Sequence, residues 1–240
     1  MKIKNVTALV VALLSLALAG CVSVPNIEMQ HTSAAPIRRI ALLKTAPPRN
    51  VQVMNIGGAA MAFGAIGGAI QGGVNADHAK QFAAILAKQP ALSEKIMTDV
   101  ESSLKADGYE VIVVRDQAPK VAADGKSDDY SGVHVDADAI LSVWFGVVGY
   151  MSSPYSAHYE PWVLVKARLL DAKTKKDLYF KTFCVGYKPK IENAVMLPAD
   201  SRFRFGSFDD LIAHSDDAIA GIVSCEKLTA DRIGSDLRVQ

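Results

Sequence analysis

Between residues 92 and 104 an apolar side chain recurs at every fourth position, and this periodicity constrains the fold more than any other feature of the chain. The four residues of the series are Leu92, Ile96, Val100 and Leu104. Such a stripe predicts an amphipathic helix that packs on a core. Gly108 follows at a position typical of a helix C-terminus, and the run 109–114 has the composition of a strand. An earlier apolar run, 37–43, completes the order strand, helix, strand, which predicts a parallel pair with a right-handed crossover.

Three further apolar runs are predicted to be strands, at 139–150, 162–170 and 178–187. The polar segment 171–176 has the length of a hairpin loop, so the last two strands are expected to be antiparallel. Near the C-terminus, Ser207 is placed to cap a helix whose apolar stripe extends to residue 225.

These elements predict a single α/β (α+β) domain over residues 37–226. Its sheet is expected to be mixed and partly antiparallel, with about five strands and with helices packed on at least one face. Residues 227–240 are expected to form a polar tail that is ordered only in part.

The first residues have the layout of a secretory signal, because Lys2 and Lys4 precede the apolar run 6–18. The run ends in Leu18-Ala19-Gly20-Cys21, which resembles the lipobox of bacterial lipoproteins. That resemblance implies removal of residues 1–20, acylation of Cys21 with fatty acids such as palmitate, and anchoring in a lipid bilayer.

The residues after the lipobox indicate which membrane holds the protein and how far the domain stands from it. An aspartate directly after the lipidated cysteine retains enterobacterial lipoproteins at the inner membrane, and this chain has Val22 and Ser23 there instead. The resemblance therefore implies the outer membrane, with the domain in the periplasm. The inner membrane and the cell surface stay as alternatives. Residues 21–36 are polar and contain two prolines, which predicts a tether that lifts the domain off the membrane.

The segment 50–76 contains no charged residue. Small residues recur in it at helical spacing: Gly57, Ala60, Gly64, Gly68 and Gly72. The pattern resembles the glycine zippers of some outer-membrane lipoproteins and small pore-forming peptides, which implies a helix that packs closely on another helix or contacts a membrane. A flexible loop inserted between strand and helix is the other interpretation, because glycine weakens a helix in water.

Two cysteines remain besides Cys21. The periplasm is oxidising, and Cys184 and Cys225 lie on a strand and a helix that are expected to face one core, so we predict a disulfide between them. Two buried free thiols are the alternative.

An aromatic cluster marks the segment between the predicted strands 139–150 and 162–170. It consists of Tyr150, Tyr155, Tyr159 and Trp162. Aromatic side chains with polar tips are favoured at interfaces, so the segment is a candidate interaction loop for a partner protein or a membrane surface. A loop folded back on its own aromatic side chains is equally compatible with the sequence.

No motif predicts a catalytic, cofactor-binding or metal site. The chain lacks the Gly-x-Ser-x-Gly elbow and the phosphate-binding P-loop. The segments 134–138, 158–160 and 214–217 each combine histidine with acidic residues, but without a second ligand cluster they are interpreted as solvated surface. Loss of Lys2 and Lys4 with the signal changes the formal charge from +1 to −1, so a nucleic-acid partner is not expected.

The order of elements resembles, between residues 37 and 225, the periplasmic lipoprotein domains of the curli-secretion (CsgG-like) and penicillin-binding-protein activator (LpoB-like) types. This resemblance implies a non-enzymatic envelope factor that assembles with itself or with an envelope protein. The alternative is a membrane-perturbing or pore-forming lipoprotein that uses residues 50–76. An envelope hydrolase is disfavoured because no nucleophile and base stand in a recognisable motif.

Overall fold

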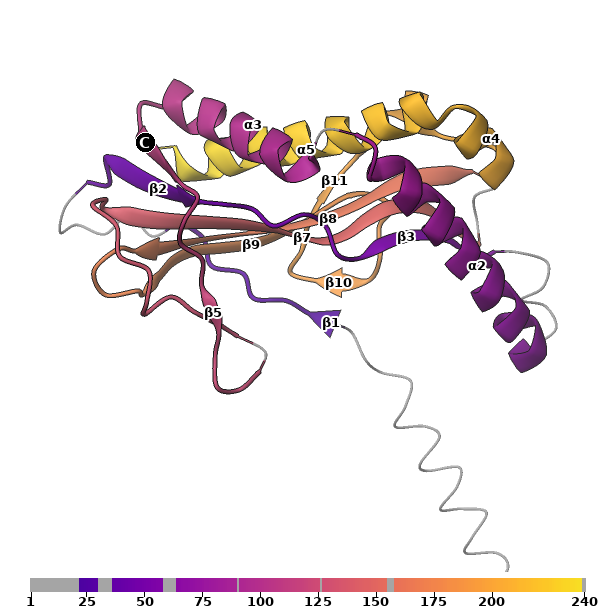
Figure 1. Ribbon diagram of the computed structural model, residues 1–240, viewed down its shortest axis with the longest axis horizontal. Coiled ribbons are helices and arrows are strands. Elements are labelled where there is room, and N and C mark those ends of the chain that lie inside the picture. Colours follow the sequence, from indigo (N-terminus) through magenta and orange to yellow (C-terminus); the bar gives the residue numbers. More distant parts are fainter. Residues whose placement is uncertain are drawn as a thin grey trace, which may run out of the picture.

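A mixed sheet of seven strands forms the centre of the fold (Figure 1). The computed structural model describes residues 22–29, 36–57, 64–89, 91–125, 127–154 and 158–238. The strand order is β11-β9-β8-β7-β2-β4, and β3 pairs with β7 outside this path. The strands are β2 (Arg39–Leu43), β3 (Val51–Asn55), β4 (Glu110–Val114), β7 (Ala139–Ser152), β8 (Tyr159–Asp171), β9 (Asp177–Gly186) and β11 (Val195–Leu197).

The sheet is mixed because β2 runs parallel to both β4 and β7, whereas β7, β8 and β9 are antiparallel neighbours. Two short pairs lie outside it: β1 (Val22–Ser23) with β10 (Ile191–Glu192), and β5 (Lys120–Val121) with β6 (Asp128–Asp129). The prediction of one α/β domain with a mixed sheet is confirmed, and the sheet has seven strands rather than about five.

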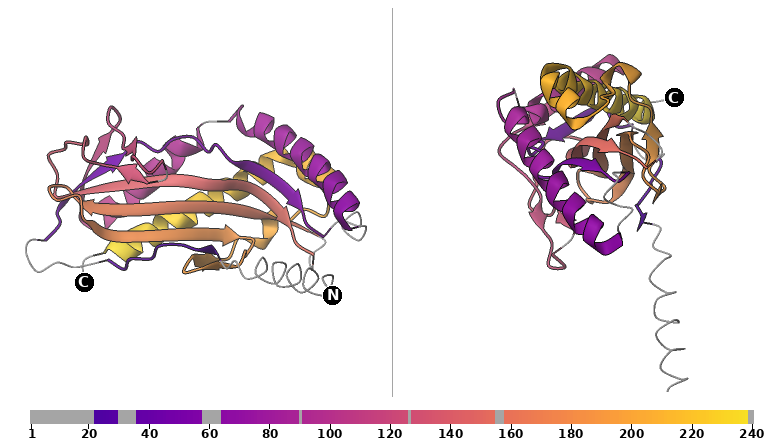
Figure 2. Two further views of the ribbon diagram at one scale, coloured as in Figure 1. Left: turned by 90° about the horizontal axis from the view of Figure 1, so that it is seen from below. Right: turned by 90° about the vertical axis from the view of Figure 1, so that its right-hand side faces the viewer.

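Among the described residues, helices cover one face of the sheet and leave the other open. They are α2 (Gly64–Leu86), α3 (Leu92–Ala106), the 3-10 helix η3 (Ser201–Phe203), α4 (Phe208–Ala213) and α5 (Ser215–Leu237). α3 and α5 lie side by side on one face, and α2 projects beyond the end of the sheet (Figure 1). The view from below shows β7, β8 and β9 with no helix in front of them (Figure 2). No helix among the described residues combines the length and the apolar character needed to cross a membrane.

The strand–helix–strand unit around α3 follows from local sequence. Its apolar stripe, Leu92, Ile96, Val100 and Leu104, is buried against the sheet. Gly108 has φ +91°, a left-handed conformation that glycine adopts without steric cost, and the chain then enters β4. β4 pairs in parallel with β2, as the sequence predicts.

The segment 50–76 divides into a strand and a helix, so the prediction of one continuous insertion was wrong. Its first part is β3, which runs parallel to the second half of β7. The two strands approach closely at Gly149, where a Cβ atom would lie only 1.7 Å from the carbonyl oxygen of Gln52. The pairing of β7 is irregular between Phe145 and Val148, and this bend lets its two halves accept β2 and β3 in turn.

The segment predicted as a tether is fixed to the domain over its described part, 22–29. Val22 pairs with Ile191, and Ile27 forms an antiparallel bridge with Phe180. Glu28 forms an ion pair with the buried Lys181. Residues 22–29 therefore provide no free length between the domain and residue 21, while Cys21 and residues 30–35 lie outside the described part of the chain.

The predicted polar tail from residue 227 is instead the second half of α5. Five of its residues are buried: Thr229, Ala230, Ile233, Gly234 and Leu237. Contact with α3 is so close that a Cβ on Gly234 would lie 2.0 Å from Ser103 Oγ. The Tyr109 hydroxyl donates a hydrogen bond to the carbonyl oxygen of Leu237, which fixes the helix end to the start of β4. The helical residues 227–237 thus belong to the domain.

Cys184 and Cys225 are both free thiols, which contradicts the predicted disulfide. Side chains alternate along a strand, and the neighbours of Cys184, Phe183 and Val185, belong to the core on the helix side. Cys184 therefore points to the opposite face of the sheet, where its Sγ donates to the carbonyl oxygen of Tyr187. Cys225 is buried on the helix side. Burial raises the pKa of the Cys184 thiol to about 11 and that of Cys225 to about 12.

Candidate functional site

A groove of about 740 Å³ lies on the open face of the sheet. Its floor comes from β7, β8 and β9, and its walls come from the N-terminal segment, the loop after β2 and the β5–β6 region. The residues that determine its chemistry are Pro25, Ile27, Lys44, Arg49, Asp128, Trp144, Lys166, Arg168, Asp177 and Phe180. We call it the basic–aromatic groove.

The strand register assembles the floor. Trp144 on β7 lies opposite Lys166 on β8, and Arg168 on β8 lies opposite Phe180 on β9. The alternating residues between them, Val143, Val165 and Ala167, point to the helix side and are buried in the core. The rings of Trp144 and Phe180 stack, with centroids 5.9 Å apart and planes inclined by 20°. The floor is thus a flat aromatic surface with basic side chains beside it.

Arg168 is held in place by three neighbours. Its Nε and Nη2 atoms donate to the two carboxylate oxygens of Asp177 at 2.5 and 3.0 Å. Its guanidinium carbon lies 5.3 Å from the ring centroid of Tyr130 and 5.9 Å from that of Phe180. The hydrogen bond that Arg168 donates to Asp177 raises the pKa of Arg168 above its usual value. Arg168 and Asp177 therefore neutralise each other and position the aromatic floor.

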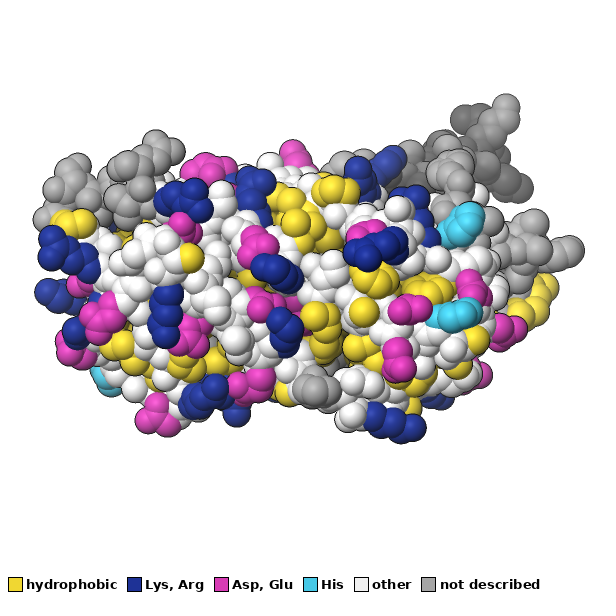
Figure 3. Space-filling view, turned by 90° about the horizontal axis from the view of Figure 1, so that it is seen from above, with side chains coloured by type: hydrophobic (Ala, Val, Ile, Leu, Met, Phe, Trp, Pro, Cys, Tyr) yellow, Lys and Arg dark blue, Asp and Glu magenta, His cyan; other side chains and the backbone are white. Residues whose placement is uncertain are grey.

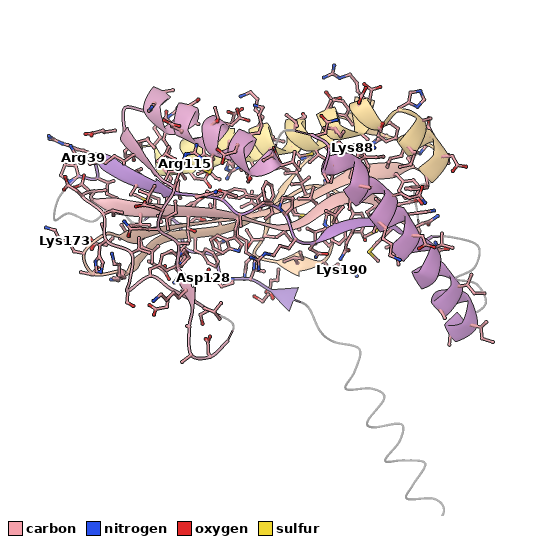
Figure 4. The ribbon with its side chains drawn as sticks, in the orientation of Figure 1. Arg39, Lys88, Arg115, Asp128, Lys173 and Lys190 are labelled. Atoms are coloured by element: carbon pink, nitrogen blue, oxygen red, sulfur yellow. The ribbon has the colours of Figure 1, made fainter. Side chains whose placement is uncertain are left out.

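The other basic residues of the groove are not neutralised. Lys44, Arg49 and Lys166 form no ion pair with any residue of the described ranges. Asp128 is the acidic residue left to oppose them, and it lies on the side of the sheet away from α3 and α5 (Figure 4). Lysine and arginine donate strong charge-assisted hydrogen bonds to carboxylates and phosphates. The groove can therefore hold an anionic group that has an apolar part attached.

The predicted interaction loop lies mostly in the core. Tyr150 is fully buried, its hydroxyl donates to the carbonyl oxygen of Ala218 at 2.9 Å, and burial raises its pKa. Tyr159 is also buried, and Trp162 packs edge-on against Tyr187. Tyr155 lies outside the described residues. The interpretation as an exposed interaction loop was wrong for Tyr150 and Tyr159.

The glycines predicted to pack on another helix differ in their surroundings. A Cβ atom built on Gly64, Gly68 or Gly72 would meet no atom of the described chain within 4 Å, whereas one on Gly57 would lie 2.7 Å from Pro154 Cα. Ala60 lies outside the described residues. No described residue packs beside these α2 glycines, so their contact with a second helix stays a prediction.

The three segments that combine histidine with acids have structural contacts. Asp138 accepts hydrogen bonds from the backbone N–H groups of Arg38 and Arg39, and Asp136 forms an ion pair with Arg39. Glu160 forms an ion pair with Arg204, and His214 contacts Asp210 on α4. No group of three potential ligands converges among the residues that the structure describes.

Sequence reasoning missed the groove because its residues come from distant segments. Alternation along β8 places Lys166 and Arg168 on the same face of one strand. Nothing local indicates that Trp144, Phe180 and Lys44 lie beside them. One local signal was present in β7. Trp144 follows the buried Val143, so alternation places its ring on the face of the sheet away from the core, which is the face that Lys166 shares.

No protein-family model matches the chain, and no curated protein matches it. Solved structures show distant likenesses. The PelC dodecamer from Paraburkholderia phytofirmans has a TM-score of 0.41 at 12% identity, covering 90% of this chain and 96% of that chain. Protein XCC0632 from Xanthomonas campestris gives 0.40 at 12%, covering 90% and 93%. Lipoprotein GNA1162 from Neisseria meningitidis gives 0.33 at 12%, covering 76% and 98%. Since these TM-scores are below 0.5, we base no functional statement on them.

Proposed function

We propose that the protein is a lipoprotein of the bacterial outer membrane with a non-enzymatic assembly or structural function, and that it assembles with further copies of itself through α2. Its anchor is the acylated Cys21 of the sequence Leu18-Ala19-Gly20-Cys21. The observation that carries the proposal is an apolar stripe on α2 that stays exposed among the described residues.

The stripe consists of three residues spaced by four. Ile66 is 76% exposed, Ile70 is 60% exposed and Val74 is 41% exposed. The described helix carries no charge before Asp77, and its N-terminal half projects from the domain (Figure 1). Exposed apolar patches mark interaction sites in soluble domains. Gly64, Gly68 and Gly72 lie on the opposite side of α2 from this stripe, because residues two positions apart in a helix are about 200° apart, and they leave open a second surface that another helix can approach closely.

A pair of cysteine variants tests self-association. Ile70→Cys introduces a thiol on the exposed stripe, and the native thiols are buried or, at residue 21, acylated. We expect a disulfide-linked dimer in cells, because the periplasm is oxidising and the two stripes face each other. Ala84→Cys is the matched control, since Ala84 is exposed on the same helix near its other end. Equal dimer yields from both variants, or none from Ile70→Cys, would contradict the proposal; a mixed adduct with another protein would indicate an envelope partner instead.

A second candidate function, membrane perturbation by the segment 50–76, is favoured by the same exposed stripe. It differs in its consequence, because a perturbing helix releases the contents of vesicles. Dye release from phospholipid vesicles that is abolished by Ile70→Asp and retained by Ala84→Asp would support this alternative. Vesicles that stay sealed while the Ile70→Cys dimer forms would support assembly.

We expect Cys21→Ser to abolish anchoring, because serine offers no thiol for the lipid. The variant should fail to incorporate labelled palmitate and should not enter outer-membrane fractions on a sucrose gradient. Palmitate labelling equal to that of the parent protein would show that Cys21 is not the acylation site. Parent protein sedimenting with inner-membrane markers would contradict the proposed location alone.

A further inference from the structure

We infer that the basic–aromatic groove binds the anionic headgroups of the bilayer that holds Cys21, so that the open face of the sheet lies on the membrane. This inference rests on the proposed acylation of Cys21. It assigns the groove a ligand class, phospholipid phosphate, and it assigns the domain an orientation.

The first step is the shortness of the connection between anchor and groove. Residue 21 directly precedes Val22, which pairs with Ile191, and the N–H of Val24 donates to the carbonyl oxygen of Glu192 at 3.2 Å. Pro25 and Ile27 then line the groove. Four residues span at most about 14 Å when fully extended. Acyl chains on residue 21 therefore hold the rim of the groove within about that distance of the bilayer.

The second step is charge. Lys44, Arg49 and Lys166 line the groove without an ion pair among the described residues. Of the two acidic residues in the described lining, Asp177 is paired with Arg168, which leaves Asp128 to oppose the three cations. Lys188 and Lys190 add two exposed cations next to Ile191, the partner of the first described residue. Figure 4 shows Lys190 beside β10, close to the start of β1.

The acidic side chains close to the anchor do not cancel these cations. Glu28 forms an ion pair with Lys181, and Glu160 forms one with Arg204. Glu160 lines a cavity of about 640 Å³ together with Lys188 and Lys190. Glu192 on β10, opposite Ser23, is a carboxylate without an ion pair in the described ranges. Basic side chains gathered beside a lipid anchor attract the anionic lipids of a membrane.

The third step is the aromatic floor. Trp144 and Phe180 are partly exposed on it, and Ile27 lies at its wall. A headgroup whose phosphate meets the basic residues would set its glycerol and upper acyl carbons against these side chains. Tryptophan is enriched at this level of membranes because its ring is apolar and its N–H is polar. A soluble anion would use the cations and leave the aromatic floor in water, so the groove fits a lipid better than a free phosphate.

The opposite face of the domain lacks these properties. Seen from above, basic and acidic side chains are interspersed over α3 and α5 (Figure 3). Several of them form ion pairs within their own helix, as Lys95 does with Asp99 and Lys227 with Asp231. The two faces therefore differ in charge as well as in distance from residue 21.

Vesicle binding tests the inference without the anchor. Every described element lies between Val22 and Arg238, so the chain that begins at Val22 keeps the whole domain. We expect it to float with vesicles of phosphatidylcholine containing phosphatidylglycerol and to bind pure phosphatidylcholine at least tenfold more weakly. Reversing the groove charge with Lys44→Glu and Lys166→Glu should weaken binding at least tenfold. Lys173→Glu and Lys176→Glu is the matched control, because these exposed residues in the β8–β9 loop carry the same charge and do not line the groove.

Trp144 reports whether the lipid enters the groove. The chain has two tryptophans, so Trp162→Phe leaves Trp144 as the single fluorophore. We expect phosphatidylglycerol with brominated acyl chains to quench it. Absence of quenching, or equal loss of binding in the groove and control variants, would overturn the inference. Displacement from vesicles by millimolar inorganic phosphate at constant ionic strength would also overturn it, in favour of a free-phosphate site. None of these results depends on acylation, which the Cys21→Ser fractionation tests separately.

Discussion

Replacing Tyr150 with alanine is expected to lower the free energy of unfolding by about 3–5 kcal/mol, the usual cost of truncating a large buried aromatic residue. Tyr150 is fully buried and joins three parts of the fold. Its ring meets Phe82 of α2 edge-on at 5.6 Å between centroids and Phe205 at 5.5 Å. Its hydroxyl donates to the carbonyl oxygen of Ala218 in α5. Urea unfolding followed by circular dichroism measures the loss.

Tyr150→Phe separates the ring from the hydroxyl. It keeps the aromatic contacts and removes one buried hydrogen bond, which costs about 1 kcal/mol. We therefore expect the phenylalanine variant to retain most of the stability that the alanine variant loses. An alanine variant within about 1 kcal/mol of the parent protein would show that α2 and α5 do not depend on this side chain.

The elements that sequence reasoning located correctly are those with a strong local signal. α3 has large apolar residues at every fourth position, and β8 alternates buried and partly exposed residues along its length. Ser207 accepts a hydrogen bond from the N–H of Asp210, so the predicted cap is confirmed, although the helix expected to extend to residue 225 is divided at His214 into α4 and α5. In each case the residues that determine the element lie within one turn or one strand.

The elements that were missed depend on distant partners. β3 is a strand because the far half of β7 accepts it, and the glycine that permits this, Gly149, is remote in sequence. The end of α5 packs closely on α3 at Gly234, and the buried polar residues Glu226 and Thr229 interrupt its apolar side, so no continuous stripe marks it in the sequence. The N-terminal residues looked like a tether because Val22 finds its partner Ile191 only in the folded chain.

The site shows the same limit. Knowing that Cys184 lies on a strand and Cys225 on a helix does not show which face of the strand the Cys184 sulfur points to. A shift of one residue along β9 would move it from the open face to the core side. The basic–aromatic groove likewise requires the register of β7, β8 and β9, since Trp144, Lys166 and Phe180 come from three strands. Alternation predicts which face a residue takes relative to its own neighbours, and only the pairing shows which residues share that face.

Glu226 on α5 makes the stability of the protein depend on pH. Its side chain is fully buried, and neither carboxylate oxygen has a hydrogen-bond partner among the described residues. Burial, with a smaller contribution from Asp99, raises the pKa of Glu226 to about 9, and Lys95 lowers it slightly. Lys95 is itself 2.8 Å from Asp99, so it does not neutralise Glu226. The folded protein therefore holds this carboxyl protonated at neutral pH.

The sign of the effect follows from the two states. The unfolded chain releases the proton above about pH 4.5, whereas the folded chain keeps it up to about pH 9. Between these values the folded state binds more protons, so the free energy of unfolding falls as pH rises, by up to about 1.4 kcal/mol for each pH unit. Glu226→Gln has nearly the same shape and cannot ionise, so it lacks this contribution.

We expect the Glu226→Gln variant to gain stability relative to the parent protein as the pH increases from 5 to 8. The comparison cancels groups common to both proteins, including His78, whose pKa is lowered by burial and whose contribution has the opposite slope. Asp231→Asn is the matched control, because Asp231 lies on the same helix with a side chain 53% exposed. Urea unfolding at four pH values measures the difference. A gap between parent and Glu226→Gln that stays constant with pH would show that Glu226 is ionised in the folded state, with water or a cation reaching it between α3 and α5.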